Sequence, residues 1–265
     1  MLQVSLDLKA EADDFHAFLL TLQSGDWTRP TLFKDWTPWD VVAHLHFFDR
    51  VSLVALEGRE AFAAERKRLI GDLKVGRSAA DVHRRDLGEL DPKALLDTWL
   101  QSCHAMADQL GASDPKCRLP WFGPDMGVSM FTTARYMETW AHAQAVYDLM
   151  NVERSHTDRI KNIAVIGVKT YGWTFVNRGL EVPAPPPYLR LVAPSGEIWE
   201  WNEPSGSESI RGDAVDFCQT VTQVRNVADT ALEVEGEVAT QWMSIAQCFA
   251  GGAEDPPKAG VRTGG

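Results

Sequence analysis

A proline-rich segment, EVPAPPP at residues 181–187, divides this chain into two stretches of different character. Proline lacks a backbone donor and clashes with the preceding helical turn, so no helix can continue through this segment. We therefore expect a helical domain at residues 1–182 and a small α/β domain at residues 183–250. The last stretch, residues 251–265, is rich in Gly and Pro and offers little to bury, which predicts a mobile tail.

Apolar residues recur at helical spacing in several segments before the connector. The expected helices cover residues 4–23, 38–58, 92–110, 130–150 and 157–178. Two of them have clear starts, because Thr37 and Asp91 are capping residues and each is followed by a proline suited to the first helical turn. The arginine-rich stretch between these two helices is interpreted as a connection. Together the segments predict an up-and-down helical bundle.

Beyond the connector, the runs YLRLVAP and EIWEWNEP flank Ser195 and Gly196 and predict a β-hairpin. Two further helices are expected at residues 213–222 and 238–249. The fold class is therefore α+β, with a helical bundle followed by a small α/β domain.

The net charge of −11 disfavours binding to nucleic acid or to an anionic membrane, because both repel an acidic protein at long range. The N-terminal residues are acidic where a secretory signal needs a basic start, and no apolar run is long enough to cross a bilayer. The four cysteines lie far apart without a CxxC spacing. We expect a cytoplasmic protein without disulfides.

One constellation of side chains suggests a metal site. Glu138 and His142 are four residues apart, so both project from one helix face. His44 lies within the apolar stripe of an earlier helix, where an imidazole needs a partner. Two imidazoles and a carboxylate are usual ligands for zinc, nickel or ferrous iron, and three protein ligands leave a position open for water or substrate.

Simpler explanations exist for each piece of this constellation. Glu138 and His142 could form a surface hydrogen bond, and His44 could donate to a carbonyl group. His46 is a second candidate ligand, although its neighbours place it on the flank of its helix. Asp40 could orient His44, but an acid in a first helical turn is explained by the helix dipole alone. The remaining histidines need no function in this reading: His16, His83, His104 and His156.

The runs DWTPWDVVAHL and RYMETWAHAQAVYDL together resemble the DinB-like metal-binding bundle, particularly the N-terminal domain of mycothiol-dependent maleylpyruvate isomerases. The resemblance covers about residues 5–175. It implies that His44, Glu138 and His142 bind the metal. It also implies a zinc ion that holds the thiolate of a low-molecular-weight thiol, which then adds to an electrophilic or unsaturated substrate.

The C-terminal runs LRLVAPSGEIWEW and IRGDAVDFCQTVTQVR are similar to the small, sterol-carrier-like domain of the same isomerases. The resemblance implies that Arg225 contacts substrate or thiol, whereas a surface arginine at a helix end is an equally simple reading. Four tryptophans near the expected site could line a pocket or belong to the core: Trp36, Trp39, Trp121 and Trp140.

These observations favour a metal-dependent enzyme, with zinc preferred over nickel or iron, that uses a thiol of the mycothiol or glutathione type. Its reaction would be an isomerisation or an S-transfer on a small electrophile. The alternative is a noncatalytic protein whose metal captures a small ligand. The expected partners are the small substrate and the thiol, and the chain could be a monomer or a homodimer.

Overall fold

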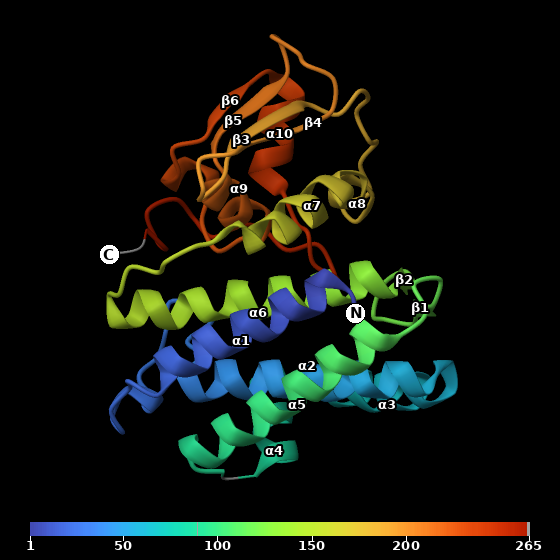
Figure 1. The fold of residues 1–265 in the computed structure, drawn as a ribbon, viewed down its shortest axis with the longest axis vertical. Coiled ribbons are helices and arrows are strands. Elements are labelled where there is room, and N and C mark those ends of the chain that lie inside the picture. Colours follow the sequence, from blue (N-terminus) through green and yellow to red (C-terminus); the bar gives the residue numbers. More distant parts are fainter. Residues whose placement is uncertain (89, 264–265) are drawn as a thin grey trace. The chain divides into compact units, whose positions relative to one another are not determined.

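The structure, a computed structural model, describes residues 1–88 and 90–263. The chain forms two compact units, Met1–Met150 and Asn151–Gly265. The first unit is helical, and the second combines helices with a four-stranded sheet (Figure 1). The α+β fold class expected from the sequence is confirmed.

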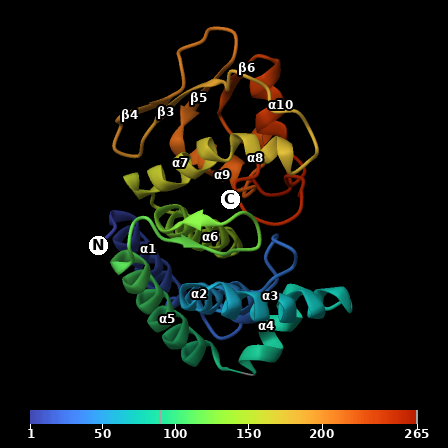
Figure 2. The same ribbon diagram turned by 90° about the vertical axis from the view of Figure 1, so that its right-hand side faces the viewer.

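Four long helices form the bundle of the first unit: α1 (Gln3–Leu19), α2 (Pro38–Glu57), α5 (Pro92–Ala112) and α6 (Val128–Met150). Both α5 and α6 pack against α1 and against α2, as Figure 2 shows from the side. A 3-10 turn, η1 (Asp26–Thr28), precedes α2, and a short ribbon of β1 (Arg118–Leu119) and β2 (Met126–Gly127) connects α5 to α6.

The starts of α2 and α5 follow from local capping. The Thr37 hydroxyl accepts from the Asp40 backbone N–H while the Asp40 carboxylate accepts from the Thr37 N–H, which makes a complete capping box. The Asp91 carboxylate accepts from the Ala94 N–H at the start of α5. The predictions for both helix starts are confirmed, and Asp40 is a capping residue as its position in the first turn indicated.

The bundle core combines apolar packing with one buried ion pair. Fully buried large side chains come from all four helices: Leu8, Phe15, Leu45, Leu95, Trp99, Phe131, Tyr136 and Trp140. Among them, the Arg135 guanidinium on α6 donates to Asp49 on α2 with an Nη2 to Oδ1 distance of 2.9 Å. Burial of a charge is tolerable only with such a partner, so this pair fixes α2 against α6.

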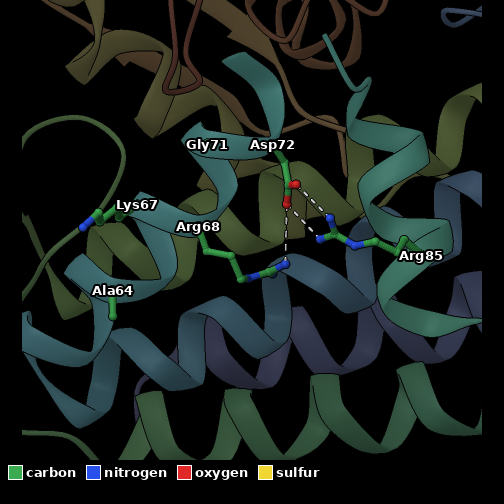
Figure 3. A pocket seen from close by; sticks show the side chains of 6 residues that line it. All are labelled: Ala64, Lys67, Arg68, Gly71, Asp72 and Arg85. Atoms are coloured by element: carbon green, nitrogen blue, oxygen red, sulfur yellow. Dashed lines mark hydrogen bonds and ion pairs between the residues drawn. The ribbon is translucent and has the colours of Figure 1, made fainter. Parts of the chain in front are cut away.

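The arginine-rich stretch is not a connection, which corrects the expectation from the sequence. It forms α3 (Arg59–Lys74) and α4 (Ala79–Leu87), and α4 begins with a second capping box between Ser78 and Asp81. Arg85 on α4 forms two hydrogen bonds to Asp72 on α3, beside a surface pocket (Figure 3). The pocket is lined by Ala64, Lys67, Arg68, Gly71, Asp72 and Arg85, and it contains none of the expected metal ligands.

The second unit is built on a sheet of strand order β4-β3-β5-β6. Its strands are β3 (Tyr188–Val192), β4 (Ile198–Trp201), β5 (Ser209–Asp213) and β6 (Glu233–Glu235). The predicted hairpin is confirmed, since β3 and β4 pair antiparallel with Leu191 opposite Trp199. Strand β5 pairs parallel to β3 and antiparallel to β6.

Short helices accompany this sheet: η2 (Asp158–Ile160), α7 (Lys161–Lys169), α8 (Tyr171–Val176), α9 (Ala214–Val221), η3 (Val227–Asp229) and α10 (Glu237–Ile245). Helix α7 packs closely on α9, because a Cβ atom added at Gly167 would lie only 3.0 Å from Phe217 and from Val221. The expected domain boundary at residues 182 and 183 therefore falls inside the second unit, which begins at Asn151.

The C-terminal segment is attached to the second unit by specific hydrogen bonds. The Gln223 side-chain amide donates to the Glu254 carbonyl, and the Asn226 amide donates to the Pro257 carbonyl. The Gly260 N–H donates to Asp229. These bonds connect the segment to the second unit, the mobility expected of residues 251–265 stays a prediction, and its last two positions, 264–265, lie outside the described residues.

Candidate metal centre

Helices α2 and α6 bring three potential ligands together, as the sequence predicted. The Glu138 Oε2 atom lies 3.1 Å from the Nε2 atom of His142 and 3.7 Å from the Nε2 atom of His44. One ligand atom from each residue lies within 4.8 Å of the other two. His44 and His142 face each other with ring centroids 4.4 Å apart.

These distances suit one divalent cation. Zinc binds imidazole nitrogen and carboxylate oxygen at about 2.0–2.2 Å, which puts two ligands of a tetrahedral ion roughly 3.4 Å apart. The observed separations of 3.1 and 3.7 Å lie on either side of that value. The side chain of Glu138 is 25% exposed, so part of this ligand faces solvent.

The electrostatics favour the metal-binding forms of the ligands. Burial lowers the pKa of His44 well below its usual range, and the nearby His142 acts in the same direction. Burial acts to raise the pKa of Glu138, but the hydrogen bonds from His142 and His44 outweigh it, so that pKa lies far below its ordinary value. A neutral imidazole and an ionised carboxylate are the states that coordinate a cation.

Aromatic rings enclose the ligands on one side. Trp36 stacks on His142 with ring centroids 5.7 Å apart and lies 4.9 Å from the ring of His44. Phe33 contacts His142 edge-on at 5.1 Å. Their loop is closed by a hydrogen bond from the Thr31 N–H to the Trp36 carbonyl. This wall excludes water from part of the centre and strengthens electrostatic interactions there.

Of the other tryptophans, Trp121 packs on Phe62 and Phe131 in the bundle, and Trp140 is buried in the core. The indole N–H of Trp39 donates to the Leu90 carbonyl. The prediction of tryptophans beside the centre therefore holds for Trp36.

A histidine that the sequence reading dismissed lies beside the ligands. His83 on α4 is 1% exposed, and its ring centroid is 5.2 Å from that of His44. It also contacts Phe47 at 4.6 Å and Trp36 at 6.3 Å. Burial lowers its pKa to about 4, so the ring is neutral. The capping box at Ser78 was the available signal, because it predicts the start of a helix; the structure shows that Val82 and His83 are buried on that helix.

The other candidates do not join the cluster. His46 is buried rather than on the flank of α2, and it is not among the clustered ligands. His104 makes a hydrogen bond to Asp13 at 2.8 Å. Asp40 does not orient the ring of His44, because its carboxylate accepts a hydrogen bond from the Thr37 hydroxyl and forms an ion pair with Arg84. The Nη2 atom of Arg84 lies 2.7 Å from Asp40 Oδ1.

Arg225 lies in the second unit, just after α9. It is 5% exposed, which excludes the reading of a surface arginine, and its Nη1 atom donates to the Val224 carbonyl. Its expected role in binding substrate or thiol is not tested by these contacts.

Helical bundles build ligand and metal sites from side chains on facing helices, and in this bundle two histidines and a glutamate from α2 and α6 meet in that way. The sequence profile of one family, described as the mycothiol maleylpyruvate isomerase N-terminal domain, matches residues 8–147, and the chain belongs to this family. The match spans α2 and α6 and therefore includes all three clustered side chains.

The comparisons also identify relatives along most of the chain. The uncharacterised proteins Rv0036c and MT0041 of two Mycobacterium tuberculosis strains are each 35% identical over 250 residues, which is 92% of this chain and 94% of each relative. The crystal structure of a mycothiol-dependent maleylpyruvate isomerase superposes with a TM-score of 0.51 at 13% identity, covering 82% of this chain and 87% of that one. At this identity the likeness establishes the fold.

Within the described residues, no helix combines the length and apolar character needed to cross a membrane. All four cysteines are free thiols.

Proposed function

We propose that this protein is a metal-dependent enzyme that uses a low-molecular-weight thiol of the mycothiol or glutathione type on a small electrophilic substrate. The observation that carries the proposal is the convergence of His44, Glu138 and His142 within 4.8 Å. Membership of the family supports the proposal, because the description of that family names a mycothiol maleylpyruvate isomerase. Zinc is the preferred metal, and nickel and ferrous iron also suit this donor set.

A bound divalent cation would supply stabilisation of the thiolate, the nucleophilic form of sulfur. The protein's own residues contribute the rest of the chemistry. The two imidazoles donate nitrogen lone pairs, the Glu138 carboxylate supplies negative charge, and Trp36 and Phe33 restrict water. Three protein ligands leave room for a sulfur ligand.

Three of the four cysteines are buried and are therefore poor substitutes for an external thiol. Burial raises the pKa of the Cys103 and Cys218 thiols well above the usual range, which suppresses their thiolate forms. Cys248 is buried as well. The nucleophilic sulfur is therefore expected to come from a cosubstrate.

Two reaction types fit this arrangement. In an isomerisation, the sulfur adds to an unsaturated carbon, a bond rotates, and elimination returns the thiol unchanged. In an S-transfer by addition, sulfur bonds to one carbon of the double bond, the thiol proton is delivered to the other as the π bond breaks, and the thiol is consumed in the product. Counting free thiol before and after turnover separates them.

The decisive experiment combines metal analysis with thiol binding. Wild-type protein purified without chelator should contain about one equivalent of metal per chain, and His142→Ala should lose it while keeping its far-UV circular dichroism. His46→Gln is the matched control, because His46 is a buried histidine of α2 outside the cluster. Undiminished metal in His142→Ala would refute the site.

Calorimetry with mycothiol, glutathione and bacillithiol then tests the thiol. Binding by the metal-loaded protein and its loss after chelation would support the enzyme. Metal at full occupancy without thiol binding would favour the noncatalytic, ligand-capturing alternative.

Three further assignments belong to this proposal. Arg225 contacts the substrate or thiol, supported by the resemblance and by its buried guanidinium, and Arg225→Lys should raise KM while leaving metal content unchanged. The protein works in the cytoplasm, supported by its free cysteines. Its partners are small molecules rather than nucleic acid or membrane, supported by the net charge of −11.

A further inference from the structure

His83 and His44 present buried nitrogen atoms that lack partners. Among the described residues, both ring nitrogens of His83 and the Nδ1 atom of His44 have no hydrogen-bond partner and no appreciable solvent contact. Leaving one buried polar atom unpaired costs about 1–3 kcal/mol. Three such atoms on two neighbouring rings therefore require an explanation beyond packing, since Phe or Leu would fill the same space without that cost.

The separation of the two rings fits a hydrogen bond between them. The distance from an imidazole centroid to a ring nitrogen is about 1.1 Å, and a hydrogen bond joins the heavy atoms at about 3 Å, so two bonded imidazoles have centroids roughly 5.2 Å apart. The observed separation is 5.2 Å, with the ring planes inclined at 62°. Two ring nitrogens that face each other across this centroid separation lie within hydrogen-bond distance.

A metal-binding histidine needs such a partner. When one ring nitrogen binds a cation, the other carries a proton, and that N–H almost always donates to an acceptor that fixes the ring orientation. The carboxylate four residues earlier, Asp40, is already engaged by Thr37 and Arg84. Glu138 lies on the Nε2 side of His44, where the cation would bind.

We infer that His83 is the positioning residue of the metal centre, whose ring nitrogen accepts a hydrogen bond from the Nδ1–H of His44 when a divalent cation is bound. This inference rests on the proposed function, because it assigns His44 as a ligand. Helix α4, which carries His83, would then determine the orientation of a ligand together with α2 and α6, the helices on which the ligands lie.

The test is zinc affinity, measured by competition with a chromophoric chelator using Zn²⁺ alone. His83→Phe keeps an aromatic ring and removes both nitrogens, and it should weaken zinc binding about 10- to 100-fold. His83→Gln retains an acceptor and should recover part of that loss. His46→Phe is the matched control, because it removes a buried histidine from α2 and should change the affinity less than about twofold.

A second readout depends on the hydrogen bond itself. Long-range ¹H–¹⁵N spectra of the zinc-loaded wild-type protein should show an exchange-protected imidazole N–H from His44, which disappears in His83→Phe and persists in His46→Phe. The wild-type spectrum needs no variant to fold, so the inference stays testable if His83→Phe is unstable. Absence of that protected N–H, or unchanged zinc affinity in His83→Phe, would overturn it.

The two proposals fail in different ways. If His142→Ala retains its zinc, the proposed centre is wrong, and the role of His83 falls with it. If His142→Ala loses zinc and His83→Phe binds as tightly as wild type, the centre stands and the inference about His83 alone is refuted.

Discussion

Replacement of Arg135 by Met removes one partner of the buried ion pair between α6 and α2. The side chains of Arg135 and Asp49 are 3% and 0% exposed, and Asp49 Oδ1 accepts from the guanidinium Nη2 at 2.9 Å and from Nε at 3.3 Å. Each hydrogen bond to a charged group contributes about 1.5–3 kcal/mol, which gives roughly 3–6 kcal/mol for the pair. This agrees with the loss of about 3–5 kcal/mol measured when a buried pair is broken.

The pair also lies on the two helices that carry the candidate ligands. Asp49 follows His44 by more than one helical turn, and Arg135 precedes Glu138 by about one turn, so the pair sets the spacing between the helices that carry the ligands. Arg135→Met should therefore weaken zinc binding although Arg135 is not among the clustered ligands. Urea unfolding followed by circular dichroism gives the free energy, and chelator competition gives the affinity.

A double variant tests the reasoning behind this magnitude. Asp49→Leu combined with Arg135→Met leaves no buried charge, so it should be close to wild type in stability and far more stable than either single variant. A cost below about 1 kcal/mol for Arg135→Met alone is the value expected of an exposed pair, and it would refute the argument. A double variant as unstable as the sum of the two single variants would do the same.

Three further predictions concern capping, acidity and metal linkage. Thr37→Ala should cost about 1 kcal/mol in urea unfolding, because it removes the capping hydroxyl of α2, whereas an unchanged midpoint would show that Asp40 caps the helix alone. Burial, followed by the charge of Arg154, lowers the pKa of His156 from 6.5 to about 4. Above pH 6.5 the imidazole is neutral in both the folded and the unfolded chain. As the pH falls from 6.5 towards 4, the unfolded chain binds a proton that the folded chain does not, so the free energy of unfolding should decrease. A pH series of thermal unfolding should be flatter in that window for His156→Gln, and an identical slope would contradict the assignment. Zinc at a hundred times its Kd should stabilise the first unit by about 2.7 kcal/mol and raise Tm, with EDTA reversing the gain; the same rise in His142→Ala would show that the ion binds elsewhere.

The sequence predicted those parts of the fold that depend on contacts between residues close together in the chain. Thr37 and Asp91 mark helix starts through contacts within one turn, and the spacing of Glu138 and His142 places both on one face of a helix. His44 was identifiable because an imidazole in an apolar stripe requires a partner. Each of these signals depends on few neighbouring residues.

The parts that were missed depend on contacts between distant segments. Helices α3 and α4 have charged sequences with few apolar anchors, among them Phe62, Leu69 and Val82. Their association includes hydrogen bonds from Arg85 to Asp72, which no periodicity reveals. Because this stretch was interpreted as a connection, no function was expected of His83, although it is buried beside the candidate ligands.

The compact unit that begins at Asn151 includes α7, which the sequence analysis had grouped with the helical bundle. The pattern of α7 indicates a helix but does not specify which surface that helix covers. The close approach at Gly167 shows that α7 packs on α9 of the second unit. A proline-rich connector can thus interrupt a domain as well as separate two domains.

The centre draws its ligands from α2 and α6, and the intervening chain includes α3, α4 and α5. During synthesis on the ribosome, His44 therefore emerges well before Glu138 and His142. A nascent chain that ends before α6 offers a single imidazole from this set, which captures zinc weakly. A metal ion held by these three side chains, as proposed above, would therefore be bound only after α6 has been synthesised.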